Sequence, residues 1–118
     1  MATLSRIAPE IPVDDLSQAI TYYNQKLGFE LAMEIANEYA IVERDGIAIH
    51  LFSDRFCKSG RAGLHIFTHQ LDELQDELFQ RGATISAPIT LRPWGNRDFR
   101  VIDLAGNTLK FTEPAAVS

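Results

Sequence analysis

Apolar and polar positions follow an order along the chain that occurs twice. Each occurrence has one extended run, one helical run and then three more extended runs. In the first, apolar residues recur at helical spacing over residues 16–27, after a possible N-cap at Asp14-Asp15, and Gly28 follows as a helix-ending residue. In the second, residues 71–81 show the same spacing and Gly82 follows. The pattern predicts two βαβββ modules of about 55 residues each.

The extended runs complete each module. They are residues 6–13, 29–35, 38–44 and 47–52 in the first module, and residues 64–68, 84–89, 99–103 and 108–112 in the second. The tight turns RDG (44–46) and DLAGN (103–107) join pairs of these runs. Pro9 and Pro12 limit the first run to a sheet edge or a bulged strand.

The length of the chain fits one domain. A chain of 118 residues is long enough for one core and too short for two independent ones. We therefore expect an α+β fold in which residues 1–118 form a single domain. Its two tandem modules, over about 6–52 and 64–113, should form a curved mixed sheet around a cleft.

Side-chain alternation along the strands predicts two different faces for each sheet. Successive side chains point to opposite faces, so aliphatic residues such as Ile49 and Leu51 share the face that should pack on a helix. The opposite face is polar and aromatic. It carries His50 and Phe52 in the first module and His65, Phe67 and Lys110 in the second. A mixed face of this kind is typical of a cleft wall, or of a sheet that is open to solvent.

Charge and composition exclude several classes of protein. A net charge of −5 argues against nucleic acid as a partner, because phosphates are bound through Lys and Arg, and it permits a cationic ligand. No run approaches the ~18–20 apolar residues that span a bilayer, so we expect no membrane partner. The N-terminal stretch lacks the basic and apolar regions of a signal peptide, and the single cysteine, Cys57, excludes an internal disulfide. We therefore expect a cytoplasmic protein.

Three stretches resemble a known family. They are IPVDDLSQAITYYNQKLGF, YAIVERDGIAIHLF and RPWGNRDFRVIDLAGNTLKFTE. Together with the paired modules, they resemble the vicinal-oxygen-chelate (glyoxalase/bleomycin resistance/extradiol dioxygenase) superfamily from about Ile7 to Glu113. The PWGNRDF stretch that leads into DLAGN is most similar to the bleomycin resistance protein group. That resemblance implies a homodimer that exchanges an N-terminal arm containing Pro9 and sequesters a drug, without turnover, in clefts between the subunits.

The resemblance also implies four positions at which enzymes of the superfamily hold a metal ion. In this sequence they are Ala8, His50, His65 and Lys110. A catalytic ion needs several ligands and an open coordination position. Ala8 cannot ligate, Lys110 would repel a metal ion, and Glu10 and Glu113 would each need a register shift to contribute. We therefore expect no bound metal, no cofactor and no catalytic residue.

Eight residues are expected to contact a ligand. They are Tyr39, His50, Phe52, His65, Phe67, Trp94, Asp98 and Lys110. The resemblance places Trp94 beside the drug groove, although a tryptophan in this loop also suits an edge of the core. Tyr39 falls where drug-binding members carry an aromatic residue. The implied ligand is a small cationic aromatic antibiotic of the bleomycin type, whose flat rings suit aromatic walls.

Two other functions fit the same residues. One is a metal-dependent lyase or dioxygenase that uses His50 and His65 with an unexpected third ligand. The other is a binding domain for another small aromatic metabolite or antibiotic.

Overall fold

The computed structural model describes residues 1–54 and 61–115, and Cys57 lies outside this part of the chain. Two βαβββ modules follow one another, as the sequence predicts. The first contains β1 (Glu10–Val13), α1 (Leu16–Leu27), β2 (Glu30–Ile35), β3 (Tyr39–Arg44) and β4 (Ile47–Ser53). The second contains β5 (Gly63–Phe67), α2 (Leu71–Arg81), β6 (Ile85–Leu91), β7 (Arg97–Ile102) and β8 (Thr108–Glu113).

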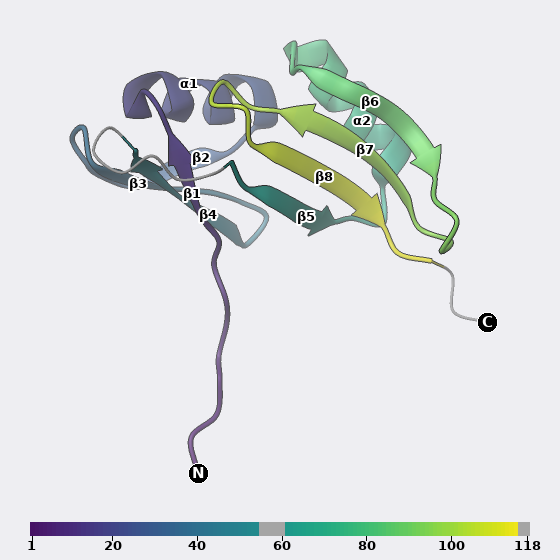
Figure 1. Cartoon of the computed structure of the whole chain (residues 1–118), viewed down its shortest axis with the longest axis horizontal. Coiled ribbons are helices and arrows are strands. Elements are labelled where there is room, and N and C mark those ends of the chain that lie inside the picture. The colour runs from purple at the N-terminus through teal and green to yellow at the C-terminus, as the bar shows by residue number, and fades with distance from the viewer. Residues whose placement is uncertain (55–60, 116–118) are drawn as a thin grey trace.

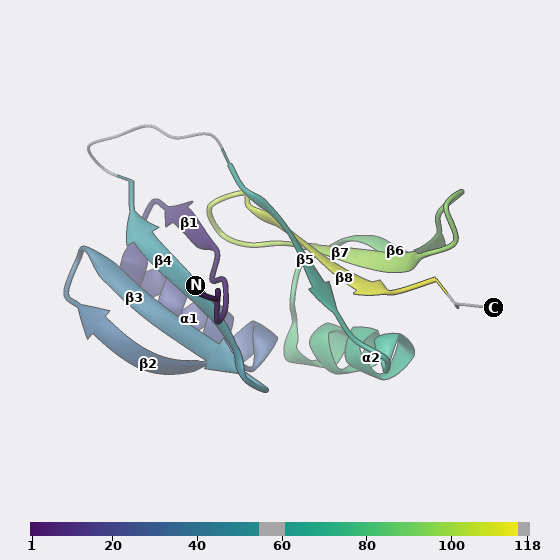
Figure 2. The same ribbon diagram turned by 90° about the horizontal axis from the view of Figure 1, so that it is seen from below.

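Each module folds into its own four-stranded mixed sheet. The strand order is β1-β4-β3-β2 in the first sheet and β5-β8-β7-β6 in the second. The first strand of each module pairs in parallel with the last, and the other pairs are antiparallel. Each helix lies against one face of its own sheet (Figures 1 and 2). The expected α+β architecture of two tandem modules is therefore confirmed, and it leaves one face of each sheet free of helix.

Local signals determine where the helices begin and end. The Asp15 side chain accepts a hydrogen bond from the Gln18 backbone at 3.0 Å, so Asp15 rather than Asp14 caps α1. Gly28 ends α1 in the left-handed conformation, with φ 77°, and Gly82 ends α2 in the same way. Neither helix in the described part of the chain is long and apolar enough to cross a membrane.

The first strand is shorter than the sequence suggests. The prediction of an extended strand over residues 6–13 is wrong for its first half, because only Glu10–Val13 pair with β4. The last ladder bond runs from the His50 amide to the Pro9 carbonyl at 3.0 Å. The arm formed by residues 1–9 extends away from the body (Figure 1), and Leu4 and Ile7 are 100% and 96% exposed.

Strand β7 begins earlier than expected. Arg97 and Asp98 belong to it and pair with Glu113 and Thr112 of β8. The alternation of side chains therefore places Asp98 on the helix-free face, in the middle of the sheet rather than in a loop.

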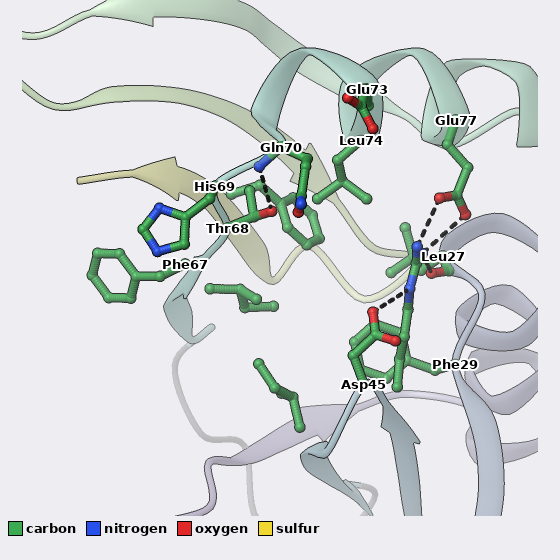
Figure 3. Close-up of a pocket in the computed structure, with 14 residues that line it drawn as sticks. Leu27, Phe29, Asp45, Phe67, Thr68, His69, Gln70, Glu73, Leu74 and Glu77 are labelled. Atoms are coloured by element: carbon green, nitrogen blue, oxygen red, sulfur yellow. Dashed lines mark hydrogen bonds and ion pairs between the residues drawn. The ribbon is translucent and has the colours of Figure 1, made fainter. Parts of the chain in front are cut away.

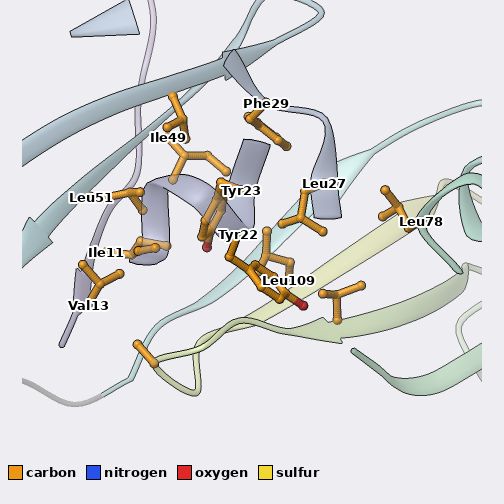
Figure 4. Close-up of a cluster of buried hydrophobic side chains, with 14 of the residues drawn as sticks. Ile11, Val13, Tyr22, Tyr23, Leu27, Phe29, Ile49, Leu51, Leu78 and Leu109 are labelled. Atoms are coloured by element: carbon orange, nitrogen blue, oxygen red, sulfur yellow. The ribbon is translucent and has the colours of Figure 1, made fainter. Parts of the chain in front are cut away.

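The helix-facing side chains of both modules form one core. Ile49, Leu51 and Leu109 are fully buried there. Figure 4 shows Tyr22 and Leu109 in the same cluster, and the Tyr22 hydroxyl donates to the Ile102 carbonyl at 3.2 Å, so the first helix packs against the second module as well as its own.

Buried hydrogen bonds also join the modules at the turn between β7 and β8. The Tyr23 hydroxyl donates to Asp103 Oδ2 at 2.8 Å, and the Asn107 side-chain amide donates to the Pro12 carbonyl at 2.7 Å. Asp103 also accepts from the backbone amides of Ala105 and Asn107. The DLAGN turn is therefore a structural junction that fixes one module on the other.

Candidate functional site

The helix-free face of the first module carries a hydrogen-bonded trio. Glu10 on β1 lies directly beside His50 on β4, and Tyr39 on β3 contacts both. The Tyr39 hydroxyl lies 2.8 Å from Glu10 Oε2 and 2.7 Å from His50 Nδ1, with the two rings edge to face at 5.6 Å. Phe52 pairs with Tyr39 across the strands. Three of the eight predicted ligand residues are therefore neighbours.

Proton counting fixes the roles within this trio. A phenol has one proton, and an ionised carboxylate can only accept, so the Tyr39 hydroxyl donates to Glu10. His50 must then donate its Nδ1 proton to the Tyr39 oxygen, which leaves Nε2 of the neutral ring as an acceptor. Burial and the nearby Glu10 carboxylate raise the pKa of Tyr39, so the phenol stays protonated at neutral pH.

The helix-free face of the second module carries a different group. The His65 and Phe67 rings stack nearly parallel at 6.0 Å, and Phe67 is 58% exposed. The Thr112 hydroxyl donates to the Lys110 carbonyl at 3.2 Å and lies 3.0 Å from His65 Nδ1. Since its proton is already used, the hydroxyl accepts from His65 Nδ1. Lys110 pairs with His65 across the strands.

Internal symmetry reveals a residue that sequence reasoning placed wrongly. Glu10 and His65 stand at the same distance before the N-cap residues Asp15 and Gln70. His50 and Lys110 stand at the same distance after the glycines of their hairpins. The Glu10–His50 pair of the first module therefore corresponds to the His65–Lys110 pair of the second. Glu10 needs no register shift to join the site, contrary to expectation, and this repeat in the sequence was the signal that could have identified it.

Few potential metal ligands lie close together among the described residues. Ala8 lies in the arm outside β1, and Glu113 is bound to Arg97. In residues 1–54 and 61–115 no group of three or more His, Cys, Asp or Glu side chains is arranged to hold a metal. Glu10 and His50 supply two donors, and the corresponding pair in the second module contains the cation of Lys110.

Asp98 is a structural residue of the second sheet. Its side chain is 2% exposed, and Arg92 binds both carboxylate oxygens, at 2.7 and 3.0 Å. The hydrogen bonds from Arg92 hold the pKa of Asp98 below its usual range. Both oxygens are therefore occupied, and Asp98 positions Arg92 on the sheet instead of offering a free carboxylate to a ligand.

Trp94 lies in the turn between β6 and β7. Its side chain is 65% exposed, so it does not close an edge of the core. The other seven predicted ligand residues lie on strands. A ligand role for Trp94 stays a prediction.

A cavity of about 500 Å³ lies at the junction of the two modules. Figure 3 shows Thr68, His69 and Gln70 on one side of it, with Phe29 and Asp45 on the other. Arg44 bridges the junction, because its guanidinium donates to the Leu27 carbonyl at 2.8 Å and to Glu77 at 2.7 and 3.0 Å. Of the eight predicted ligand residues only Phe67 lines this cavity. Its walls come from distant segments, and no sequence motif marks it.

The predicted residues thus form two groups rather than one site. Tyr39, His50 and Phe52 lie on the first sheet, whereas His65, Phe67 and Lys110 lie on the second. Among the strands of the described residues, no pair joins the two sheets.

The chain belongs to the glyoxalase/bleomycin resistance protein/dioxygenase superfamily, whose family model matches residues 3–111. No relative among the curated proteins matches it. Similar solved structures include a bleomycin resistance determinant encoded on the transposon Tn5, with a TM-score of 0.83, 18% identity and coverage of 96% of this chain and 100% of that one.

Two further structures show how widely this fold is used. TioX from Micromonospora sp. ML1 has a TM-score of 0.78 and 23% identity, with 92% of this chain and 98% of that chain covered. A lactoylglutathione lyase from Agrobacterium tumefaciens has a TM-score of 0.77 and 16% identity, with coverage of 95% and 96%. At these identities the similarity establishes the fold alone. A resistance protein and a lyase share it, so function has to be argued from the site.

Proposed function

We propose that this protein is a non-catalytic, homodimeric member of the bleomycin resistance group that sequesters a small cationic aromatic antibiotic of the bleomycin type. The observation that carries the proposal is the trio of Glu10, Tyr39 and His50 on an open sheet face. It offers a carboxylate and two rings, and no third metal donor joins Glu10 and His50 among residues 1–54 and 61–115.

The first module supplies the charge for a cationic group. The side chain of Glu10 is exposed, and Tyr39 holds one of its oxygens in place. Glu43 lies on the same face, since it follows Tyr39 by four residues in β3 and every second side chain of a strand shares a face. A cationic tail gains from carboxylates and from the faces of aromatic rings, and this face has both.

The second module supplies a surface for flat rings. Phe67 is more than half exposed, and the His65 ring stacked on it is oriented by Thr112. Stacking on such a pair is worth roughly 0.5–1.5 kcal/mol beyond the burial of apolar area.

A second copy of the chain would bring the two faces together. The arm exposes Leu4 and Ile7 almost completely, and the edge strand β2 exposes three large apolar side chains. They are Leu31, Met33 and Ile35. Exposed apolar side chains gathered on one strand and on an extended arm favour an interface. A homodimer that exchanges the arm would cover this surface and enclose the ligand between one module of each subunit.

Calorimetric titration with bleomycin tests the proposal. We expect saturable binding of one drug per chain at micromolar concentration. Glu10→Gln should weaken binding roughly 5- to 10-fold, because one carboxylate partner is lost. Asp76→Asn is the matched control, since it removes an exposed carboxylate from α2 and should leave the affinity unchanged. Absence of heat with bleomycin, or equal losses in the two variants, would contradict drug sequestration at this site.

The adjacency of Glu10 and His50 favours a metal-dependent enzyme as the second candidate function. Elemental analysis and assays with added Zn, Ni, Fe or Mn distinguish the two. Metal-dependent turnover that His50→Ala abolishes would replace the binding proposal with the enzymatic one.

A further inference from the structure

Basic side chains gather on the helix-free face of the second sheet. Arg100 on β7 lies directly opposite Lys110 on β8, and Lys110 lies directly opposite His65 on β5. The three residues therefore form one row across neighbouring strands, which are spaced about 4.8 Å apart. Like charges directly opposite one another destabilise a sheet. An ion pair between Arg100 Nε and Asp98 Oδ1, at 3.6 Å, offsets part of this repulsion, and it does not involve Lys110.

The acidic residue on this face neutralises the row only in part. Arg92 donates to both oxygens of Asp98, and Arg100 Nε forms an ion pair with Asp98 Oδ1 at 3.6 Å, which is longer than a hydrogen bond. Arg100 Nε is buried and has no hydrogen-bond partner among residues 1–54 and 61–115. Within the same residues the Lys110 ammonium has no ion pair or hydrogen bond. The single carboxylate of Asp98 thus faces the cations of Arg92, Arg100 and Lys110, and a buried donor without a partner destabilises the protein until an acceptor arrives.

The rings beside this row determine what kind of acceptor fits. His65 and Phe67 form a stacked pair on the strand next to Lys110, and Thr112 fixes the His65 ring. A flat ring could lie on Phe67 while an acidic group attached to it reaches Lys110 and Arg100. A guanidinium and an ammonium together suit a carboxylate, sulfate or phosphate, which accept several hydrogen bonds at once.

We propose that the row of His65, Lys110 and Arg100 is a binding site for an anionic group carried on an aromatic ring. The proposal goes beyond a cationic drug, because it gives the second module a ligand chemistry opposite to that of the first. At the corresponding positions the first module carries Glu10 and His50. A ligand enclosed between the two faces would be cationic at one end and acidic at the other.

Three probes of one shape and different charge test this site. Benzoate, benzamide and benzamidine are titrated into the full-length protein, with phenyl phosphate as a second anion, and the side-chain NMR signals of His65 and Lys110 are followed. We expect benzoate and phenyl phosphate to shift both signals saturably. Benzamide should bind roughly 10-fold more weakly, and benzamidine should leave both signals unshifted. The ratio of the two anion affinities distinguishes a carboxylate site from a phosphate or sulfate site.

Two variants and one control locate the site. Lys110→Gln and Arg100→Gln should each weaken phenyl phosphate binding roughly 5- to 10-fold, whereas Lys26→Gln on α1 should not change it. Circular dichroism verifies that each variant is folded, and either substitution alone is sufficient if the other fails to fold.

Benzamide binding as tightly as benzoate, or unchanged affinity in the folded variants, would overturn the anion site. The drug titration is an independent readout. If the protein binds the anions but not bleomycin, the proposed function alone is refuted. If it binds bleomycin but not the anions, the anion site alone is refuted.

Discussion

The two modules have the same fold, and they carry opposite chemistry on their open faces. The first places an exposed carboxylate, Glu10, beside His50, and the second places His65 beside the Lys110 cation, which has no ion pair within the described part of the chain. A hydroxyl orients the histidine in both, from Tyr39 in one and from Thr112 in the other. The backbone repeat therefore fixes where a functional side chain stands, while the sequence decides its charge.

This difference lies at corresponding positions of the two modules. Where the first module carries the potential metal ligands Glu10 and His50, the second carries His65 and the cation of Lys110. The repeated backbone thus presents two open faces of unlike charge.

The largest difference is expected between the two hairpin aspartates. Asp103 accepts four buried hydrogen bonds, whereas Asp45 at the first hairpin is exposed. Asp103→Asn places an amide donor against the Tyr23 hydroxyl or the Asn107 amide. It should lower the free energy of unfolding by about 2–4 kcal/mol in urea denaturation. Asp45→Asn should change it by less than about 0.5 kcal/mol. Similar values for both would contradict a structural role for the second turn.

The next effect concerns acid stability in the second module. Because Arg92 lowers the pKa of Asp98, the ion pair stabilises the folded state fully above the ordinary carboxylate pKa, near pH 4. That stability is lost as the pH falls through the lower pKa of the folded state. Arg92→Gln should therefore destabilise the protein at pH 7 and should show a smaller further loss between about pH 4 and pH 2. Thermal unfolding of the unmodified protein and of Arg92→Gln across this pH range measures both losses of stability. Parallel pH profiles of the two proteins would contradict the ion pair as the source of this stability.

Removing the hydroxyl that orients each histidine should affect ligand binding at one face without affecting the other. Tyr39→Phe removes the link between Glu10 and His50, and Thr112→Val removes the partner of His65. Each change should cost about 1 kcal/mol of stability. Tyr39→Phe should weaken bleomycin binding a few-fold without altering phenyl phosphate binding, and Thr112→Val should do the opposite. If both variants weaken both ligands equally, the two faces act as one site.

The smallest effect is expected at Trp94. Because its side chain is 65% exposed, Trp94→Phe should change the free energy of unfolding by less than about 0.5 kcal/mol. As the only tryptophan, Trp94 also reports its surroundings by fluorescence. A saturable change in emission with bleomycin would place it at the drug site, and unchanged emission during calorimetrically observed binding would place the drug elsewhere.

The features that the sequence predicts well depend on neighbouring residues. Helical spacing and the glycines Gly28 and Gly82 determine both helices locally, and alternation along β4 places His50 on the helix-free face. The sequence did not indicate that Glu10 joins the site, because its contact with His50 depends on the parallel pairing of β1 with β4, a strand far along the chain.

Pairing also explains the other differences. Asp98 reads as a loop residue until the β7–β8 register and its ion pair with Arg92 are known. The cavity at the module junction is built by residues from separate elements, such as Phe29, Asp45 and Thr68, so no local pattern could predict it.

The hydrogen bonds of the DLAGN turn have a consequence for the order in which the chain matures during synthesis. The Pro12 carbonyl and the Tyr23 hydroxyl are made before their partners, Asn107 and Asp103, which follow 95 and 80 residues later. The first module therefore emerges with polar groups that water must satisfy, so its native packing waits until the second module has been made. Two separately made halves should each be poorly folded and should recover structure when mixed.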